Sequence, residues 1–251
     1  NYRQTLLAES SRLTTSRHTD PLYRKASATH TEAVRLQEQG RHKLALDAAE
    51  QARTSFLEAY CAAQSPAPGE HKALWCHNAF GVEGMTWNET VRVLADNGFT
   101  AILPNMCWGG VAFYRSEVLP VADSIHKTGD QIAACLKACR NNNVECHVWK
   151  VNFNMGSHTP NSFRQKMKKQ GRIQKDRSGQ LHEKWLCPSH PENSELEVKA
   201  MLEIVSNYDV DGIHFDYIRY RGNNCCYCEG CRRGFEGYIG KTLTNWREQT
   251  Q

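Results

Sequence analysis

The sequence predicts a mixed α/β fold with a parallel sheet, because two kinds of apolar segment alternate after residue 72. Short runs rich in β-branched and aromatic residues are each followed by a longer amphipathic segment, and this alternation is typical of right-handed βαβ units. The segments with strand character are 73–80, 100–106, 144–153 and 210–218. The segments with helix character are 86–99, 130–143 and 192–208.

The first of these helices carries recognisable boundary signals. Thr86 is a candidate N-cap, and Glu89 follows three residues later, which is the spacing of a capping box. Gly98 is suited to end the helix, because glycine readily adopts the left-handed conformation that often follows a last turn.

Residues 1–65 are predicted to form an α-helical hairpin appended to this domain. Apolar and small residues recur at helical spacing from Thr31 to Ala63, and "QGRH" at 39–42 supplies a turn. Only one such pair is recognisable, whereas a helical solenoid needs about three repeats. We therefore interpret it as an appendage for packing or for docking a partner. The Pro- and Gly-containing stretch that follows predicts a linker at 66–72.

Composition limits the possible classes of function. The chain has 251 residues, of which 40% are hydrophobic, so it can bury a substantial core. No apolar run approaches the length of a membrane span. The net charge of +4 is too small to indicate a nucleic-acid partner. The eleven cysteines are odd in number and several stand singly in apolar segments, so we interpret most of them as small buried hydrophobic residues.

Polar residues at the ends of the strand segments favour a barrel over a doubly wound sheet. They are His77, Asn78, Asn105, Lys150, Asn152, Asn154, His214, Asp216 and Arg219. In a parallel (β/α)8 barrel this end of the sheet carries the active site. Neither G-x-G-x-x-G nor G-x-x-x-x-G-K-[ST] follows the first strand, so the phosphate-binding signature of the doubly wound alternative is missing. Each residue taken singly is also compatible with a role in capping its strand.

Four segments resemble the glycosyl-hydrolase-like family 10, a family of (β/α)8-barrel glycosidases. They are "WCHNAFGVEGMTW", "GFTAILPNM", "HVWKVNFN" and "DGIHFDYIRY", and the resemblance covers roughly residues 73 to 235. It implies a glycoside hydrolase acting on a poly- or oligosaccharide, with Asp216 as the catalytic carboxylate. Arg221 stands where the family motif usually has Pro. A glycan-binding protein without catalytic activity is the alternative.

The same end of the sheet is expected to bind carbohydrate. The expected substrate-binding residues are His77, Asn105, Trp108, Trp149, Lys150, Asn152, His214, Tyr217 and Arg219. Trp108, Trp185 and Tyr114 are candidates for stacking on sugar rings, because a pyranose presents an apolar C–H face. Ordinary packing is the alternative for each tryptophan. No organic cofactor is expected, and the resemblance favours a periplasmic or extracellular location.

The number of strand–helix units falls short of a closed barrel. A barrel needs eight units in about 250 residues, and residues 73–251 supply little more than four. We therefore expect the amino-terminal half of a barrel, completed by the remaining half or by a second copy. Glycoside hydrolysis normally needs two carboxyl groups about 5–10 Å apart. The second is expected on the missing strands, with Glu83 as a local substitute.

A cysteine cluster follows the fourth strand segment. Cys226, Cys228 and Cys231 have the spacing C-x-C-x-x-C, which predicts three thiolate ligands of a structural zinc ion. The fourth ligand remains open among Cys225, Cys187 and His190. Reduced thiols or a local disulfide are the alternatives to a metal.

The segment 163–177 holds seven Lys or Arg residues. Base-stacking aromatic residues are not interleaved with these charges, which argues against a nucleic-acid-binding surface. We therefore predict that the segment is a solvated loop. A zinc-clipped nucleic-acid-binding module is the less favoured alternative.

Overall fold

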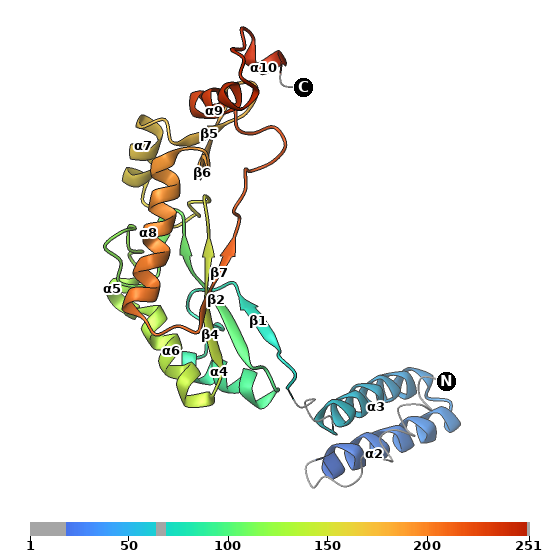
Figure 1. Cartoon of the computed structure of the whole chain (residues 1–251). Helices are drawn as coiled ribbons and strands as arrows, with labels where there is room; N and C mark the ends of the chain where they lie inside the picture. Colours follow the sequence, from blue (N-terminus) through green and yellow to red (C-terminus); the bar gives the residue numbers. More distant parts are fainter. Residues whose placement is uncertain (1–18, 64–68, 250–251) are drawn as a thin grey trace. The chain divides into compact units, whose positions relative to one another are not determined.

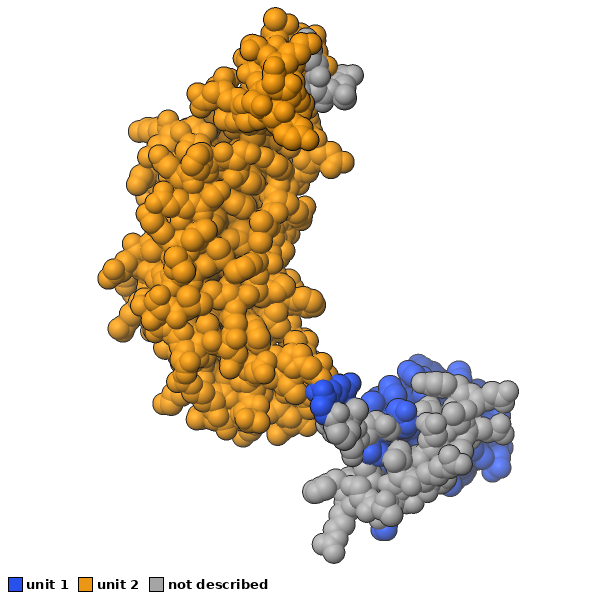
Figure 2. Space-filling model, viewed as in Figure 1, with its two compact units in different colours: residues 1–70 blue, residues 71–251 orange. Residues whose placement is uncertain are grey.

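The computed structural model of the chain describes residues 19–63 and 69–249. They belong to two compact units, residues 1–70 and residues 71–251 (Figure 2). The remainder of the predicted hairpin, 1–18 and 64–65, and part of the predicted linker, 66–68, lie outside the described residues. No helix in the described ranges is both long enough and apolar enough to cross a membrane.

The first unit contains two helices that pack against each other, α2 (Thr19–Glu38) and α3 (His42–Ala63). Small residues line the seam between them: Ala45, Ala52 and Ala59 recur every seventh residue of α3 and are buried. Because residues seven apart lie close to one face of a helix, this spacing produces a continuous stripe of small side chains. The stripe lets the two backbones approach closely.

The second unit is built on a parallel sheet with the strand order β1-β2-β4-β7 (Figure 1). These strands are β1 (Ala73–Cys76), β2 (Ala101–Trp108), β4 (Glu145–Val151) and β7 (Gly212–Asp216). The helices α4 (Trp87–Asp96), α6 (Gln131–Asn142) and α8 (Pro191–Asn207) connect them in turn. A short strand β3 (Val111–Ala112) pairs with β2, and the short helix α5 (Ile125–Thr128) precedes α6. The predicted parallel α/β architecture is confirmed.

The connecting helices cover one face of this sheet. Their apolar residues, such as Val91 of α4, Ile132 of α6 and Ile204 of α8, form one buried cluster with Cys146 and Val148 of β4. The predicted capping box of α4 is confirmed, because Thr86 Oγ1 accepts from Glu89 N and the Glu89 carboxylate accepts from Thr86 N. Because side chains alternate along a strand, the side chains of these strands that do not face the helices lie on the opposite face of the sheet.

Beyond β4 the chain builds a smaller layer. It consists of α7 (Asn161–Lys169) and an antiparallel hairpin of β5 (Ile173–Lys175) and β6 (Leu181–Leu186), with α9 (Glu229–Ile239) and α10 (Trp246–Gln249) after β7. Figure 1 shows α9 and the β5–β6 hairpin close together at the end of the unit farthest from α4.

The prediction of a solvated loop at 163–177 is wrong, because these residues form most of α7 and all of β5. Met167 and Ile173 are buried with Leu186 in a small apolar cluster. Arg172 is also buried, and its Nη1 lies 3.2 Å from a Glu192 carboxylate oxygen. The few apolar residues that anchor the segment are widely separated among charges, so their periodicity is weak in the sequence.

Candidate functional site

β4 and β7 bring the predicted site residues together by their register. Trp149 lies opposite His214, and Val151 lies opposite Asp216. Since successive side chains of a strand point to opposite faces, Trp149, His214 and Asp216 lie on the face away from Val148 and the connecting helices. The sheet thus gathers two strand ends around one carboxylate.

The Asp216 carboxylate is held by two N–H donors. Its Oδ2 accepts from Trp149 Nε1 at 3.1 Å, and its Oδ1 accepts from the backbone N–H of Tyr217 at 2.7 Å. The Arg219 guanidinium instead lies over the Tyr217 ring, 4.6 Å from the ring centroid. In the part of the chain that the structure describes, Asp216 forms no ion pair with Arg219. The carboxylate is therefore oriented without being neutralised by a cation.

Tyr217 has an unusual backbone conformation, with a φ of 56°. This left-handed region is uncommon for bulky residues, and such conformations concentrate at functional sites. The turn carries the Tyr217 ring to within 5.5 Å of the Trp185 ring, measured between centroids. Tyr217, Arg219 and Trp185 therefore form a group directly beyond the end of β7.

Aromatic and imidazole rings cover the sheet face next to Asp216. The centroid of Trp149 lies 4.7 Å from that of His77 and 6.2 Å from that of His214. Trp75 Nε1 donates to His214 Nε2 at 3.2 Å. Because an indole N–H can only donate, His214 Nε2 is the acceptor in this contact. Trp75 remains 56% exposed, so this ring surface is open to a ligand.

A cleft of about 360 Å³ lies beside these rings. Its lining includes His77, Asn78, Phe80, Asn105, Trp108, Phe113 and His158. Asn105 is 2% exposed, and its Oδ1 has no hydrogen-bond partner among the residues that the structure describes. Buried acceptors are rarely left unpaired, so this oxygen is available to a ligand hydroxyl group. His77 connects the cleft to Asp216 through its contact with Trp149.

Two predicted substrate contacts are instead buried beneath the sheet. Lys150 is fully buried, and its Nζ lies 2.6 Å from Glu197 Oε2 of α8. Asn152 donates from Nδ2 to the same oxygen at 3.2 Å and is 2% exposed. Lys150 follows Trp149 in the strand and so faces the opposite side. The prediction that Lys150 and Asn152 contact substrate is therefore wrong in this structure, where both residues join α8 to the sheet.

The predicted stacking role of Tyr114 is also wrong. Tyr114 is fully buried, and its hydroxyl donates to Glu203 Oε2 at 3.2 Å. Burial raises the pKa of its phenol far above the ordinary value. Glu83, the local candidate for a second carboxylate, lies in the exposed turn between β1 and α4.

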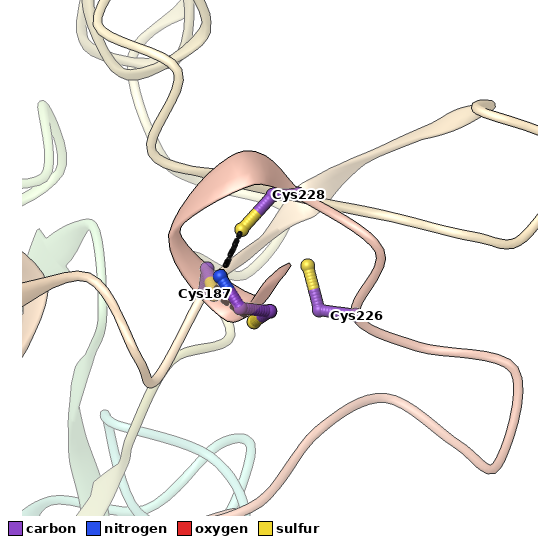
Figure 3. Close-up of side chains that lie close together, drawn as sticks. Cys187, Cys226 and Cys228 are labelled. Atoms are coloured by element: carbon purple, nitrogen blue, oxygen red, sulfur yellow. Dashed lines mark hydrogen bonds between the residues drawn. The ribbon is translucent and has the colours of Figure 1, made fainter. Parts of the chain in front are cut away.

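Four cysteine thiols form a second candidate site. The sulfur atoms of Cys187, Cys226, Cys228 and Cys231 all lie within 4.8 Å of one another and could hold a metal ion (Figure 3). Cys187 comes from the segment after β6, whereas the other three come from the loop after β7 and the start of α9. Hydrogen bonding among the thiols, with Cys187 as the first contributor, lowers the pKa of Cys228 far below its ordinary value.

Sequence reasoning left the fourth member of this cluster open, and the structure supplies Cys187. The two remaining candidates, Cys225 and His190, lie outside the group of sulfur atoms. Trp75 was missed at the first site. Its position in β1, two residues before His77 in the extended segment that the sequence predicts, is the signal that places both on one face.

Comparisons with known proteins agree with the sequence pattern. Residues 73–244 match the family described as Glycosyl hydrolase-like 10. A 62-residue part of the chain is 34% identical to an S-layer-related protein of Niallia circulans. This match covers 24% of the chain and 4% of the bacterial protein.

Proposed function

Because the chain belongs to the Glycosyl hydrolase-like 10 family over residues 73–244, we propose that it forms part of a (β/α)8-type glycoside hydrolase acting on a poly- or oligosaccharide. Asp216 is the catalytic carboxylate in this proposal. The observation that carries it is the placement of Asp216 at the carboxyl end of β7, held by Trp149 and beside exposed aromatic rings. The carboxyl ends of the strands are where parallel barrels bind and transform substrates.

Asp216 acts as the nucleophile in this proposal. Two N–H donors fix its oxygens, so the carboxylate is preoriented toward a sugar bound over the sheet face. As nucleophile it attacks the anomeric carbon and forms a glycosyl–enzyme ester, while a second carboxyl group about 5 Å away protonates the departing oxygen. Water then hydrolyses the ester with that second group acting as base. We assign the second group to the strands that would close the barrel.

The substrate would lie across the aromatic face and the adjoining cleft. The ring faces of Trp75, Trp108 and Tyr217 match the apolar C–H faces of pyranoses. The free Oδ1 of Asn105 would accept a hydrogen bond from a sugar hydroxyl group. A metal held by the four cysteines would have no chemical step in this scheme, because four thiolates leave no position open to water.

A glycan-binding protein without catalysis is the second candidate, favoured by the position of Glu83 in an exposed turn and by the pairing of Glu197 with Lys150. The full-length protein separates the two when it is incubated with a panel of polysaccharides. A hydrolase releases new reducing ends from the polysaccharide. A protein that only binds releases none, but the same polysaccharide in an affinity gel slows its migration. If the protein neither binds nor hydrolyses any polysaccharide of the panel, both candidates are contradicted.

Two ion pairs weaken the support for the nucleic-acid alternative. Arg172 of the basic segment is committed to Glu192, and Lys168 lies 2.6 Å from Glu183. Ion pairs of this kind reduce the positive charge that the segment can offer to phosphates.

A further inference from the structure

We propose that Cys187, Cys226, Cys228 and Cys231 bind one structural zinc ion, which ties the loop after β7 to the β5–β6 hairpin and the start of α8. All four residues lie close to the smaller layer of the second unit, and Figure 3 shows three of them converging. The assignment follows from the arrangement of these four side chains and is independent of the proposed hydrolase activity.

The sulfur geometry fits a tetrahedral zinc site. Zinc–sulfur bonds of about 2.3 Å place neighbouring sulfurs of a tetrahedron about 3.8 Å apart. The Cys187 sulfur lies 3.7 Å from that of Cys228 and 3.4 Å from that of Cys231. None of the four cysteines forms a disulfide. Four thiols at this spacing leave room for one ion at their centre.

The surroundings of the sulfurs match those of metal-bound thiolates, which accept hydrogen bonds from nearby donors. The backbone N–H of Lys175 donates to Cys226 Sγ at 3.3 Å, and that of Cys231 donates to Cys228 Sγ at 3.5 Å. Cys228 is also the N-cap of α9. The positive end of this helix therefore stabilises negative charge on the cluster.

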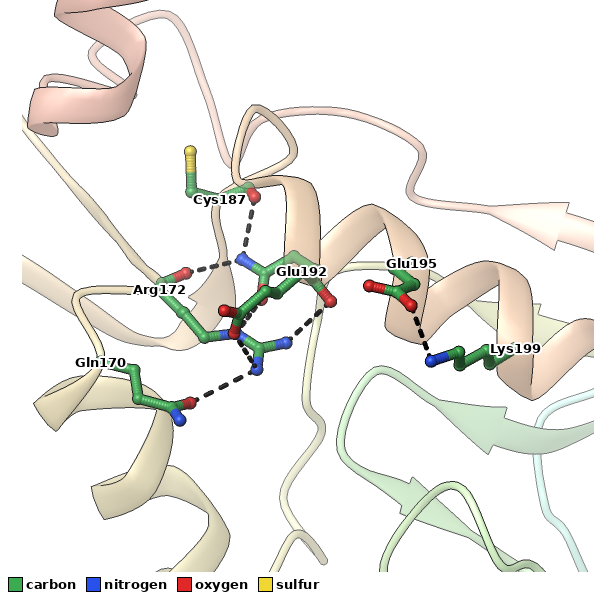
Figure 4. Close-up of polar contacts among 7 residues, drawn as sticks. Gln170, Arg172, Cys187, Glu192, Glu195 and Lys199 are labelled. Atoms are coloured by element: carbon green, nitrogen blue, oxygen red, sulfur yellow. Dashed lines mark hydrogen bonds and ion pairs between the residues drawn. The ribbon is translucent and has the colours of Figure 1, made fainter.

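Cys187 is held by a rigid polar frame. Asn193 is fully buried and donates from Nδ2 to the carbonyl oxygens of Cys187 and Arg172, each at 2.9 Å. Arg172 Nε donates to Asn193 Oδ1 at 2.6 Å, and the Arg172 guanidinium also contacts Glu192 (Figure 4). This frame fixes the position of Cys187 through α8 and β5, independently of the loop that carries the other three cysteines.

The loop after β7 is fastened to the same hairpin at other points. Arg221 N donates to Gln174 Oε1 at 3.0 Å, and Tyr227 N donates to Lys175 O at 2.9 Å. With zinc bound, the loop that begins with Tyr217 and Arg219 is anchored at both ends, by β7 and by the metal. The ion thus acts as a positioning element for the residues beyond Asp216.

A second cysteine group provides a contrast within the same chain. Cys135, Cys139 and Cys146 also lie within 4.8 Å of one another, but all three are buried in the main apolar core. Three thiolates and a divalent ion would carry a net charge there without compensating donors, which is costly in an apolar core. We therefore interpret them as packed thiols of the apolar core.

The test uses the full 251-residue chain purified without chelator. Elemental analysis should find about one zinc per chain, and replacement by Co²⁺ should give the visible absorption bands of tetrahedral sulfur coordination. Cys187→Ser and Cys228→Ser should each lower zinc occupancy at least about fivefold, whereas Cys225→Ser, in the same loop, should retain it. Far-ultraviolet circular dichroism confirms that each variant keeps its helices.

Several results would overturn the assignment. They are a metal-free protein with disulfides among these cysteines, stoichiometric iron in place of zinc, or full zinc occupancy in Cys187→Ser. A Cys135→Ala variant that loses the zinc while remaining folded would move the site to the core and would likewise refute the proposal.

Discussion

Trp149 Nε1 donates to Asp216 Oδ2 at 3.1 Å, so neighbouring strands β4 and β7 meet at the candidate catalytic carboxylate. The indole also contacts His77 at the edge of the cleft. One side chain therefore connects the proposed nucleophile to the proposed sugar-binding surface. This relationship leads to predictions that separate catalysis, substrate binding and stability.

Trp149→Phe should reduce kcat while leaving the fold intact. The substitution keeps an aromatic ring but removes the N–H that orients Asp216. Losing a hydrogen bond to a charged group costs about 1.5–3 kcal/mol, which corresponds to roughly a 10- to 150-fold loss in rate. Trp87→Phe is the matched control, because it removes a buried indole N–H that donates to Gln131, away from the candidate site. Steady-state kinetics showing equal losses in both variants would contradict the specific role of Trp149.

Asn105→Leu should weaken glycan binding without weakening the fold. The two side chains have similar shapes, and the unpartnered buried oxygen of Asn105 makes no contribution that leucine would remove. We expect roughly a tenfold rise in the Kd for the preferred oligosaccharide, from the loss of one hydrogen bond. Calorimetric titration measures the Kd and urea unfolding measures the stability. An unchanged Kd would show that Asn105 does not contribute to glycan binding.

Lys150→Met should destabilise the protein strongly, because it leaves Glu197 buried without its partner. Breaking a buried ion pair at one side costs about 3–5 kcal/mol. Lys199→Met is the control, since Lys199 pairs with Glu195 on the exposed side of the same helix and such pairs contribute about 0–1 kcal/mol. Urea unfolding of both variants gives the comparison. A similar free energy of unfolding for the two would show that the buried pair is not needed.

Much of the fold could be predicted because its signals are local. The Thr86–Glu89 capping box and the alternation of strand and helix segments depend on residues close together in the sequence. The α7 and β5–β6 layer was missed for the opposite reason. Met167, Ile173 and Leu186 form their cluster across a highly charged segment, and tertiary contacts rather than local periodicity stabilise it.

The sequence predicted which strand ends carry the candidate site, but it did not predict which face of the sheet each residue occupies. Lys150 and Trp149 are adjacent, and a strand turns one to the helices and the other to the open face. The choice between Cys187, Cys225 and His190 also required the structure, because Cys187 is 39 positions away from Cys226 in the chain and is brought to it by the hairpin.

The measurement that tests the central claim most directly is glycan hydrolysis by the full-length protein and its Asp216→Asn variant. Asparagine keeps the shape and can accept one of the two hydrogen bonds that Asp216 accepts, while it removes the nucleophilic charge. The account predicts that the variant folds normally and that its kcat falls on the order of a thousandfold or more. Asp209→Asn, at an exposed carboxylate paired with Arg140, should leave the rate unchanged. Hydrolysis by Asp216→Asn at a rate near that of the parent protein would contradict the assignment of Asp216 as the catalytic carboxylate.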